Sequence, residues 1–431
     1  MSLATEVQLS LSVKYPTNLV GLITGDKWLN SKRESDGAEG LWRIHDGLYD
    51  VSDFISSHPG GPSWLEMTKG TDITEAFEAH HVNLVAEKTL QKYYVRKALA
   101  PRNSPFTFEE DGFYRTLKRN IRPILKTVPK STIRATDLVI DALVVGTFLT
   151  AICAAKFMSL AFACVCAFLL TFTTIAAHNY FHKRDNFRMY YFNLCLMDFR
   201  GWRISHALSH HLFPNTIYDL EMITWETLVP YFPVKKSFAF KCKACVTAVI
   251  LWVTVYFISY AFKVYTIIKT QKMYLSDLIP FTLPLAMYLI NTANPLAAVK
   301  MWLLIVTVAS FIFGVIGFSA AHHHPDAFHE GDAPRAKKLD WAIHQLDTTY
   351  DRYKVTGNSF LVLTTFGDHA LHHIFPTLDH GALKYLYPVF EKTMKEFGLG
   401  HQMRSQTEMF IGQFRQLARD TPHVLPAGSR N

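Results

Sequence analysis

The sequence has little cysteine and little charge. Only six of its 431 residues are cysteine, in no framework of paired spacings, and only 19% are Asp, Glu, Lys or Arg. Small disulfide-stapled domains need a regular cysteine framework, so we expect free thiols and a reducing, cytosol-facing environment. With 49% apolar residues the chain is not a disordered tail. The mean hydropathy of +0.08 is high for a wholly soluble protein and indicates local membrane segments.

A secretory leader, an internal repeat and a low-complexity segment are also missing. Residues 1–30 hold no apolar run between a basic start and a small-residue cleavage site. We therefore expect the amino terminus to stay in the cytosol.

The apolar residues are concentrated in a few runs. Residues 138–177 form a run about twice as long as the ~20 residues that cross a membrane, and Lys156 divides it near the middle. This pattern predicts a hairpin of two transmembrane helices. Two further blocks cover residues 245–264 and 297–321. A shorter stretch between them, 278–289, contains two prolines and is predicted to be interfacial or re-entrant.

Basic residues gather beside these runs. Residues 113–136 contain seven Lys and Arg and no acidic residue, which predicts a membrane-surface linker. Basic residues also follow the first hairpin, precede residues 245–264 and follow residues 297–321. Cytosolic loops are enriched in Lys and Arg, so four crossings with both termini in the cytosol fit the pattern. The net charge of +8 does not indicate a nucleic-acid partner, because the basic residues form no face interleaved with aromatic residues.

The polar region before the first run carries a possible metal site. A His-Pro-Gly-Gly turn starts at His58, and a histidine pair, His80 and His81, lies near position 80. The tight turn can present His58 from a fixed backbone, and a second histidine could close on a metal from the opposite side. The alternative is a surface turn with two unrelated histidines.

Most of the remaining histidines fall into four tight clusters beside the apolar runs. The predicted topology brings all four clusters to one face of the membrane, which favours a shared metal site. Neighbouring His210 and His211 would point about 100° apart on a helix, which suits two ions better than one. Each cluster alone could equally be a polar helix end, and imidazole suits iron, zinc and copper. The clusters are His178 and His182; His206, His210 and His211; His322, His323 and His324; and His369, His372 and His373.

The segment around residues 50–81 resembles a cytochrome b5 domain, in which the histidine of this turn and a later histidine are the axial ligands of a heme. The resemblance implies heme b on His58 and His81, because the second ligand in fused domains stands four residues after a phenylalanine, here Phe77. His80 is then a neighbour of the pocket. Two histidine ligands leave the iron no open position, so the implied role is one-electron transfer.

The motifs at residues 206–215 (HALSHHLFPN) and 369–376 (HALHHIFP) extend the resemblance. The chain resembles the cytochrome b5 fusion fatty acid desaturases, whose histidine boxes carry a di-iron centre. An electron-carrying heme also favours iron over redox-inactive zinc. Among the three histidines that follow the last crossing, the resemblance favours His322 over His323. The implied iron ligands are His178, His182, His206, His210, His211, His322, His369, His372 and His373.

The resemblance implies a multidomain fold. A small α+β cytochrome b5-like heme domain is expected at residues 20–101 and a basic linker at 102–136. An all-α membrane domain with four transmembrane helices and a cytosolic histidine-rich cap follows at 137–400, and a C-terminal tail at 401–431.

The implied activity is O2-dependent desaturation of a fatty acyl lipid or acyl-CoA at the endoplasmic reticulum membrane, with two non-heme iron ions and heme b. The sequence has no G-x-G-x-x-G in a strand–turn–helix context for a flavin or nicotinamide. A separate reductase, such as a cytochrome b5 reductase, must therefore supply electrons. The alternatives are a fatty acyl or sphingolipid hydroxylase and a non-catalytic, membrane-anchored heme electron carrier.

Three departures from the family pattern leave the ligand set intact. Asn179 replaces the aspartate common in the first box, and three residues instead of two precede the paired histidines of the second box. His369 stands where front-end desaturases usually have glutamine. These departures bear on regioselectivity.

Overall fold

The amino-terminal domain is a small α+β unit. The computed structural model of the chain describes residues 9–11, 23–291 and 294–430. An antiparallel sheet, ordered β1-β2-β3, packs Trp42, Ile44 and Tyr49 into a core of its own. The elements are α1 (Gly25–Ser35), β1 (Trp42–Ile44), β2 (Gly47–Tyr49), η2 (Ser52–Ser57), α2 (Pro62–Thr68), α3 (Thr74–His80), α4 (Val85–Leu90), η3 (Gln91–Tyr93) and β3 (Tyr94–Lys97).

Four helices of the second domain are long and apolar enough to cross a membrane. They are α6 (Lys130–Phe157), α7 (Leu160–Phe181), α10 (Phe238–Thr270) and α12 (Pro295–Phe318). Met158, in the left-handed conformation, ends α6, and the Ser159 side chain caps α7. The first two helices therefore form the expected hairpin. The predicted fold class, a small α+β domain followed by a mainly helical domain with four apolar helices, is confirmed.

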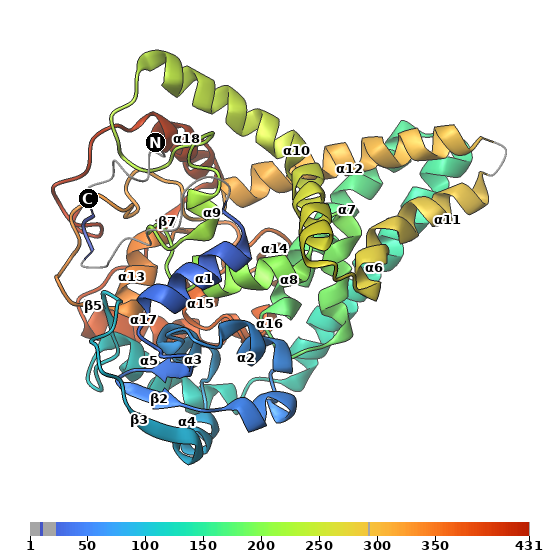
Figure 1. Cartoon of the computed structure of the whole chain (residues 1–431). Helices are drawn as coiled ribbons and strands as arrows, with labels where there is room; N and C mark the ends of the chain where they lie inside the picture. Colours follow the sequence, from blue (N-terminus) through green and yellow to red (C-terminus); the bar gives the residue numbers. More distant parts are fainter. Residues whose placement is uncertain (1–8, 12–22, 292–293, 431) are drawn as a thin grey trace.

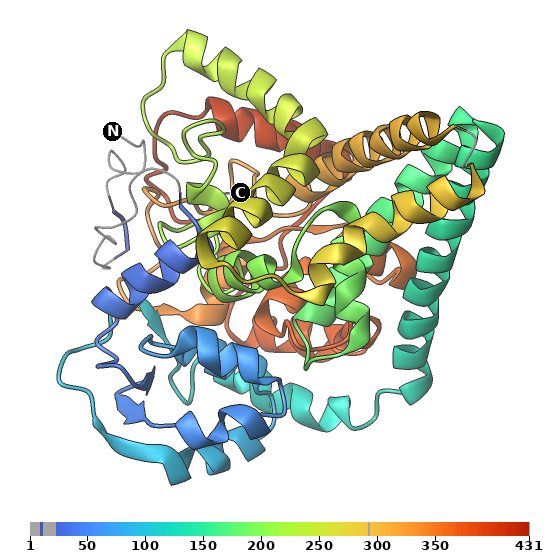
Figure 2. The same cartoon turned by 45° about the vertical axis from the view of Figure 1, so that its right-hand side comes forward.

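The shorter apolar stretch is not among the four helices long enough to cross a membrane, and its interfacial or re-entrant placement stays a prediction. It forms η6 (Leu275–Phe281) and α11 (Thr282–Ile290), and α11 packs along α6 and α12. The Asn291 amide donates to the carbonyl of Ala155, near the end of α6. Figures 1 and 2 show α11 and α12 running out beside the α6–α7 hairpin to a common end, whereas α10 stays closer to the rest of the molecule. The stretch thus packs as part of the helical bundle, because its neighbours supply the burial that its length does not.

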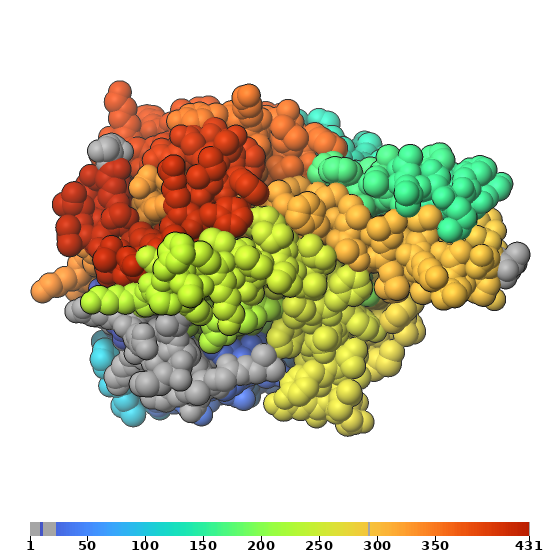
Figure 3. Space-filling model, turned by 90° about the horizontal axis from the view of Figure 1, so that it is seen from above, coloured from blue at the N-terminus to red at the C-terminus, as the bar shows by residue number. Residues whose placement is uncertain are grey.

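The other elements form a cap at the opposite end of these helices. Seen from above, α10 lies beside the carboxy-terminal α18, while the ends of α6, α7, α11 and α12 project away from both (Figure 3). Two short parallel strand pairs, β4–β5 and β6–β7, join segments of the cap that lie far apart in the sequence. Its elements are β4 (Phe106–Thr107), α5 (Phe113–Leu125), η4 (Phe187–Cys195), α8 (Phe199–Trp202), η5 (Arg203–His210), α9 (Leu220–Ile223), β5 (Leu339–Asp340), α13 (Trp341–Thr348), β6 (Asp351–Arg352), α14 (Ser359–Thr364), α15 (His369–Ile374), α16 (His380–Leu383), α17 (Tyr387–Glu396), β7 (Met403–Arg404) and α18 (Gln406–Ala418).

The amino-terminal domain is fixed against the cap. Glu78 of α3 is buried and binds Lys118 Nζ, 2.9 Å away, and Arg115, both on α5. The Trp28 indole donates to the carbonyl of Tyr218, at 2.9 Å. Two basic residues of the expected membrane-surface linker therefore face a buried carboxylate instead of lipid.

The crossing of α10 and α12 supplies a test of this packing. A Cβ added at Gly314 would lie 2.5 Å from Trp252 Cβ and 2.6 Å from its Cα. Gly314→Ala must push the helices apart, so we expect it to lower the free energy of unfolding by about 1–3 kcal/mol. Thermal unfolding in detergent measures this. Gly317→Ala on the same helix is the control, since its Cβ would meet nothing closer than 3.9 Å. Equal stability of the two variants would contradict the packing.

Candidate metal centre and heme pocket

Nine histidines converge in the cap as two groups. The first holds His178, His182, His206, His211 and His372, and the second holds His210, His322, His369 and His373. Within each group the nearest ring nitrogens all lie within 4.8 Å of one another, and every ring is buried. Both groups sit where α7 and α12 end, together with η5 and α15. The structure thus brings together all nine positions that the sequence singled out.

The spacing within the groups suits metal ions. Nε2 atoms approach to 2.9–3.1 Å in four pairs: His178–His372, His206–His211, His322–His369 and His322–His373. Two nitrogens that each lie about 2.1 Å from one ion, at an angle of about 90°, are separated by about 3 Å. Among the described residues, both ring nitrogens of His182 and Nδ1 of His211 and His372 have no hydrogen-bond partner. A neutral imidazole has one N–H donor and one acceptor, so one ring nitrogen of His182 is a buried, unpaired acceptor that fits a metal centre.

Burial keeps most of these rings neutral. It lowers the pKa of His182, His211, His322, His369, His372 and His373 well below the ordinary value. A neutral imidazole retains the lone pair that a metal needs. His210 is the exception: burial would lower its pKa, but the carboxylates of Asp219 and Glu221 raise it to about 9.

A stretch of π-helix decides which histidines of the second cluster share a group. In η5 the His211 N–H donates to the carbonyl of His206, five residues earlier, at 2.8 Å. The wider turn aligns His206 with His211, instead of with His210 as a regular helix would. His210 points into the other group, and the rings of His211 and His373 stack at 4.0 Å between the two groups. The expectation that His210 and His211 serve different ions agrees with this placement.

The triplet after α12 contributes one ring to the groups. His322 Nδ1 hydrogen-bonds to the carbonyl of Thr348 at 2.9 Å, which turns Nε2 toward the second group. His323 instead stacks on Tyr231 with ring centres 3.8 Å apart, and His324 lies against Tyr350.

A further histidine beside the first group was not predicted as a site residue. The ring of His380 lies 4.5 Å from His372 and 5.9 Å from His178, and burial lowers its pKa to about 4. Its place shortly after the fourth cluster was the only signal in the sequence.

His58 and His81 face each other in the amino-terminal domain. Their Nδ1 atoms hydrogen-bond at 2.9 Å to the carbonyls of Gly61 and Phe77, so both Nε2 atoms are left for a ligand. The ring centres are 6.2 Å apart. Two imidazoles on opposite sides of one metal, with bonds of about 2 Å, place their ring centres roughly 6 Å apart. His80 turns away and packs on Trp64, so the residues present fit a heme between His58 and His81.

Comparison with known proteins agrees with both sites. Residues 154–405 match the family described as Fatty acid desaturase, and residues 28–99 match the Cytochrome b5-like Heme/Steroid binding domain. The chain belongs to the fatty acid desaturase family. It is 46% identical to the "Cytochrome b5-related protein" of Drosophila melanogaster over 97% of both chains. It is also 24% identical to the "Probable Delta(5) fatty acid desaturase C" of Dictyostelium discoideum, over 88% of this chain and 91% of that one. No solved structure matches.

The cytochrome b5 domain meets the desaturase domain directly beside the histidine groups. Arg203, the first residue of η5, is buried and donates to Ser63 Oγ at 3.0 Å and to Asp185 Oδ1 at 2.7 Å, and its guanidinium lies 4.6 Å from the Trp64 ring. The Asp185 N–H donates to the carbonyl of Gly60. A Cβ added at Gly61 would lie 2.3 Å from Asp185 Oδ2. Position 61, in the turn that follows His58, therefore requires glycine.

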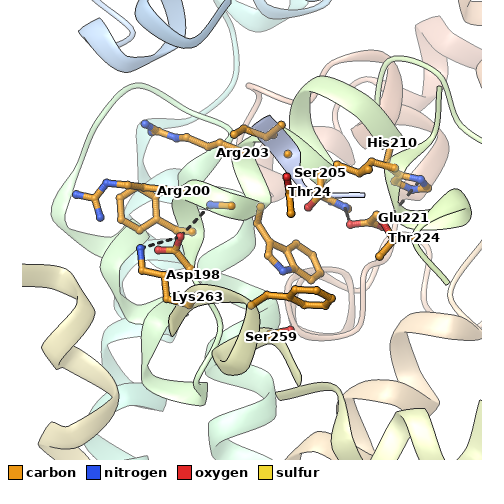
Figure 4. A pocket seen from close by; sticks show the side chains of 18 of the residues that line it. Thr24, Asp198, Arg200, Arg203, Ser205, His210, Glu221, Thr224, Ser259 and Lys263 are labelled. Carbon is orange, nitrogen blue, oxygen red and sulfur yellow. Dashed lines mark hydrogen bonds and ion pairs between the residues drawn. The ribbon is translucent and has the colours of Figure 1, made fainter. Parts of the chain in front are cut away.

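A cavity of about 950 Å³ opens at the histidine groups. The side chains of Trp202, Phe313 and Phe366 form an apolar part of the cavity wall beside His210 and His369. Farther along, Lys263 pairs with Asp198 at 3.3 Å and with Asp277 at 3.0 Å. Figure 4 shows Asp198, Arg200 and Lys263 at this polar end, away from His210 and Glu221. The volume is within the range of small-molecule sites.

The heme pocket yields a spectroscopic test. His58→Ala or His81→Ala removes one of the two facing nitrogens, so we expect each to abolish the bis-histidine heme absorption spectrum. His80→Ala is the matched control and should leave the spectrum in place, because its ring turns toward Trp64. An unchanged spectrum in both ligand variants, or its loss only in the control, would refute this pocket.

Proposed function

We propose that the protein is a membrane-bound, O2-dependent fatty acyl desaturase that receives electrons through its own cytochrome b5 domain. The observation that carries the proposal is the pair of histidine groups, spaced for two ions, beside a cavity that is walled in part by Trp202, Phe313 and Phe366. The family match and the docked heme domain support it.

The chain's residues divide into two sets of ligands. His58 and His81 would hold heme b, and the nine cap histidines would hold two irons, five histidines on one and four on the other. When bound, the irons supply O2-driven oxidation of an unactivated C–H bond, which no side-chain acid or base can break. The product would be a double bond and water.

The side chains around the cavity would position the substrate. Trp202, Phe313 and Phe366 exclude water and accept an acyl chain beside His210 and His369. Arg200 at the polar end suits an anionic phosphate, either of the head group of an acyl lipid or of an acyl-CoA. The backbone carbonyls of Thr348 and Phe366 hold the protons on Nδ1 of His322 and His369, which keeps Nε2 of each ring free.

Electrons would enter from outside the chain. A heme with two histidine ligands transfers single electrons and binds no O2. A cytochrome b5 reductase or a similar partner would reduce it, and the docked domain would pass the electrons across the Arg203 contact.

We place the protein in the endoplasmic reticulum membrane as a multi-pass protein with cytosolic termini. The heme domain and α15, which carries three of the cap histidines, lie at one end of the apolar helices (Figure 1). The basic residues beside the apolar runs favour the cytosol for that end.

Metal content separates the enzyme from a heme carrier that is only anchored by its membrane domain. We expect the purified full-length protein to contain about two non-heme irons per heme, because both histidine groups bind iron. Elemental analysis combined with heme absorption measures the ratio. Heme iron alone would rule out the desaturase and favour the carrier.

Lipid profiles test the reaction itself. We expect cells that make the wild-type protein to gain unsaturated acyl chains, and cells that make His372→Ala to lose the gain completely, because His372 belongs to the five-histidine group. Mass spectrometry of total lipids distinguishes added double bonds from added hydroxyl groups. Identical profiles for both proteins would exclude desaturation of bulk acyl chains, and hydroxylated products would indicate the hydroxylase.

The docking contact can be tested through heme reoxidation. Arg203→Met removes the hydrogen bonds of the guanidinium group at this contact. Hydrogen bonds of charged groups contribute about 1.5–3 kcal/mol each. We therefore expect reoxidation of the reduced heme by O2 and substrate to slow roughly tenfold or more. Reduction by an external reductase should not change. Stopped-flow absorbance follows both steps. Arg188→Met is the control, since Arg188 pairs with Asp137 and Asp141 at the start of α6. Equal reoxidation rates in both variants would argue against this contact.

A further inference from the structure

Two carboxylates at the start of α9, the N-cap Asp219 and Glu221 in its first turn, contact two histidines of η5 on the side away from the histidine groups. Asp219 Oδ2 lies 2.9 Å from His210 Nδ1, and Glu221 Oε1 lies 3.0 Å from His206 Nδ1. His206 belongs to the five-histidine group and His210 to the four-histidine group. One short segment therefore contacts one ring of each group, two residues apart.

These contacts determine which ring nitrogen carries the proton. An imidazole that donates Nδ1–H to a carboxylate has its lone pair on Nε2. His206 Nε2 lies 3.0 Å from His211 Nε2, inside its group. The ring of His210 lies 4.4 Å from the ring of His322 and 5.1 Å from that of His373. In both cases the carboxylate side faces away from the rest of the group.

Asp219 is held in place by other contacts. Its side chain is fully buried. Oδ1 caps α9 by accepting the N–H groups of Glu221 and Met222, and Oδ2 also accepts the Asn215 N–H at 2.9 Å. Asn215 in turn donates to the carbonyl of His322 at 3.1 Å. The carboxylate thus cannot turn without disturbing the loop that ends the 206–215 motif.

Glu221 is held less tightly. Its side chain is about one-third exposed, toward the cavity, with Oε2 4.0 Å from His210 Nδ1. Among the described residues, its carboxylate pairs with His206 and His210 only.

We propose that Asp219 and Glu221 are positioning residues, each setting the tautomer and basicity of one ligand in a different group. This inference rests on the proposed function, because it needs iron in both groups. It goes further in assigning one carboxylate to each iron: Asp219 acts through His210 on the four-histidine group, and Glu221 acts through His206 on the five-histidine group.

The test uses Asp219→Asn and Glu221→Gln in the full-length protein in detergent. In Asp219→Asn an amide that keeps the helix cap through its oxygen turns its NH2 group toward His210 Nδ1 and the Asn215 N–H, so the proton of neutral His210 moves to Nε2 and its binding to a metal weakens. Loss of such an outer partner lowers metal affinity by about 10–100-fold. We expect each variant to lose affinity for one iron only, and the double variant for both. Competition with a ferrous chelator gives the affinities, and Mössbauer spectra show which of two iron components is lost.

Asp198→Asn is the matched control. Asp198 also caps a short helix of the cap, accepting the Gly201 N–H at 3.0 Å, and it pairs with Lys263 instead of a histidine. The control variant should bind both irons with wild-type affinity. The bis-histidine heme spectrum reports folding independently of the irons. Loss of that spectrum in Asp219→Asn would mean that this variant does not fold. The test then depends on Glu221→Gln, because the Glu221 side chain caps no helix.

The outcomes separate this inference from the proposed function. Selective loss of one iron in each variant, different between the two, supports it. Wild-type affinities in both variants, equal loss of both irons in each, or a third metal bound at His206, His210 and Glu221 in the wild type would overturn it. A wild-type protein that binds no non-heme iron would refute the proposed function first and this inference with it.

Discussion

Buried imidazole nitrogens are the constraint on which the cap depends. A polar group removed from water without a partner costs about 1–3 kcal/mol, and nine histidines are buried together here. The cap satisfies the outer nitrogens of several rings with backbone carbonyls, with Gln345 and with carboxylates. Where the outer nitrogen carries the proton, the inner nitrogens turn their lone pairs toward one another, and a cation between them would remove that repulsion. The long helices, the π-helical turn and the buried loops of the cap follow from the need to hold these rings together.

Much of this arrangement could be predicted from local sequence. Hydrophobic length alone locates α6, α7, α10 and α12, because a helix that crosses a membrane needs a run of apolar residues whatever its neighbours are. The histidine clusters indicate the metal centre for a similar reason: their spacing and their position beside the apolar runs are visible without the fold. The facing of His58 and His81 follows from the His-Pro-Gly-Gly turn and its resemblance to the cytochrome b5 pattern.

The features that were not predicted depend on tertiary contacts. Nothing in residues 203–211 distinguishes a π-helix from an α-helix, so the pairing of His206 with His211 could not be foreseen. The length of α11 excludes a full crossing, but its packing against α6 and α12 could not be read from the sequence. Arg115 and Lys118 look like lipid-facing charges until Glu78 is placed beside them. Asp219 and Glu221 are ordinary acidic residues in the sequence and gain a role only from the fold.

The rigid docking of the cytochrome b5 domain on the desaturase domain would change the reaction order of electron transfer between them. Separate carrier and oxidase chains must diffuse through the membrane to meet, so their electron exchange depends on how densely both are present. Here Gly60, Gly61 and Arg203 hold the two domains in direct contact, which corresponds to a very high effective concentration of each for the other. Under the proposed function, internal electron transfer would then be unimolecular, and dilution of the protein in lipid would slow only the encounter with an external reductase.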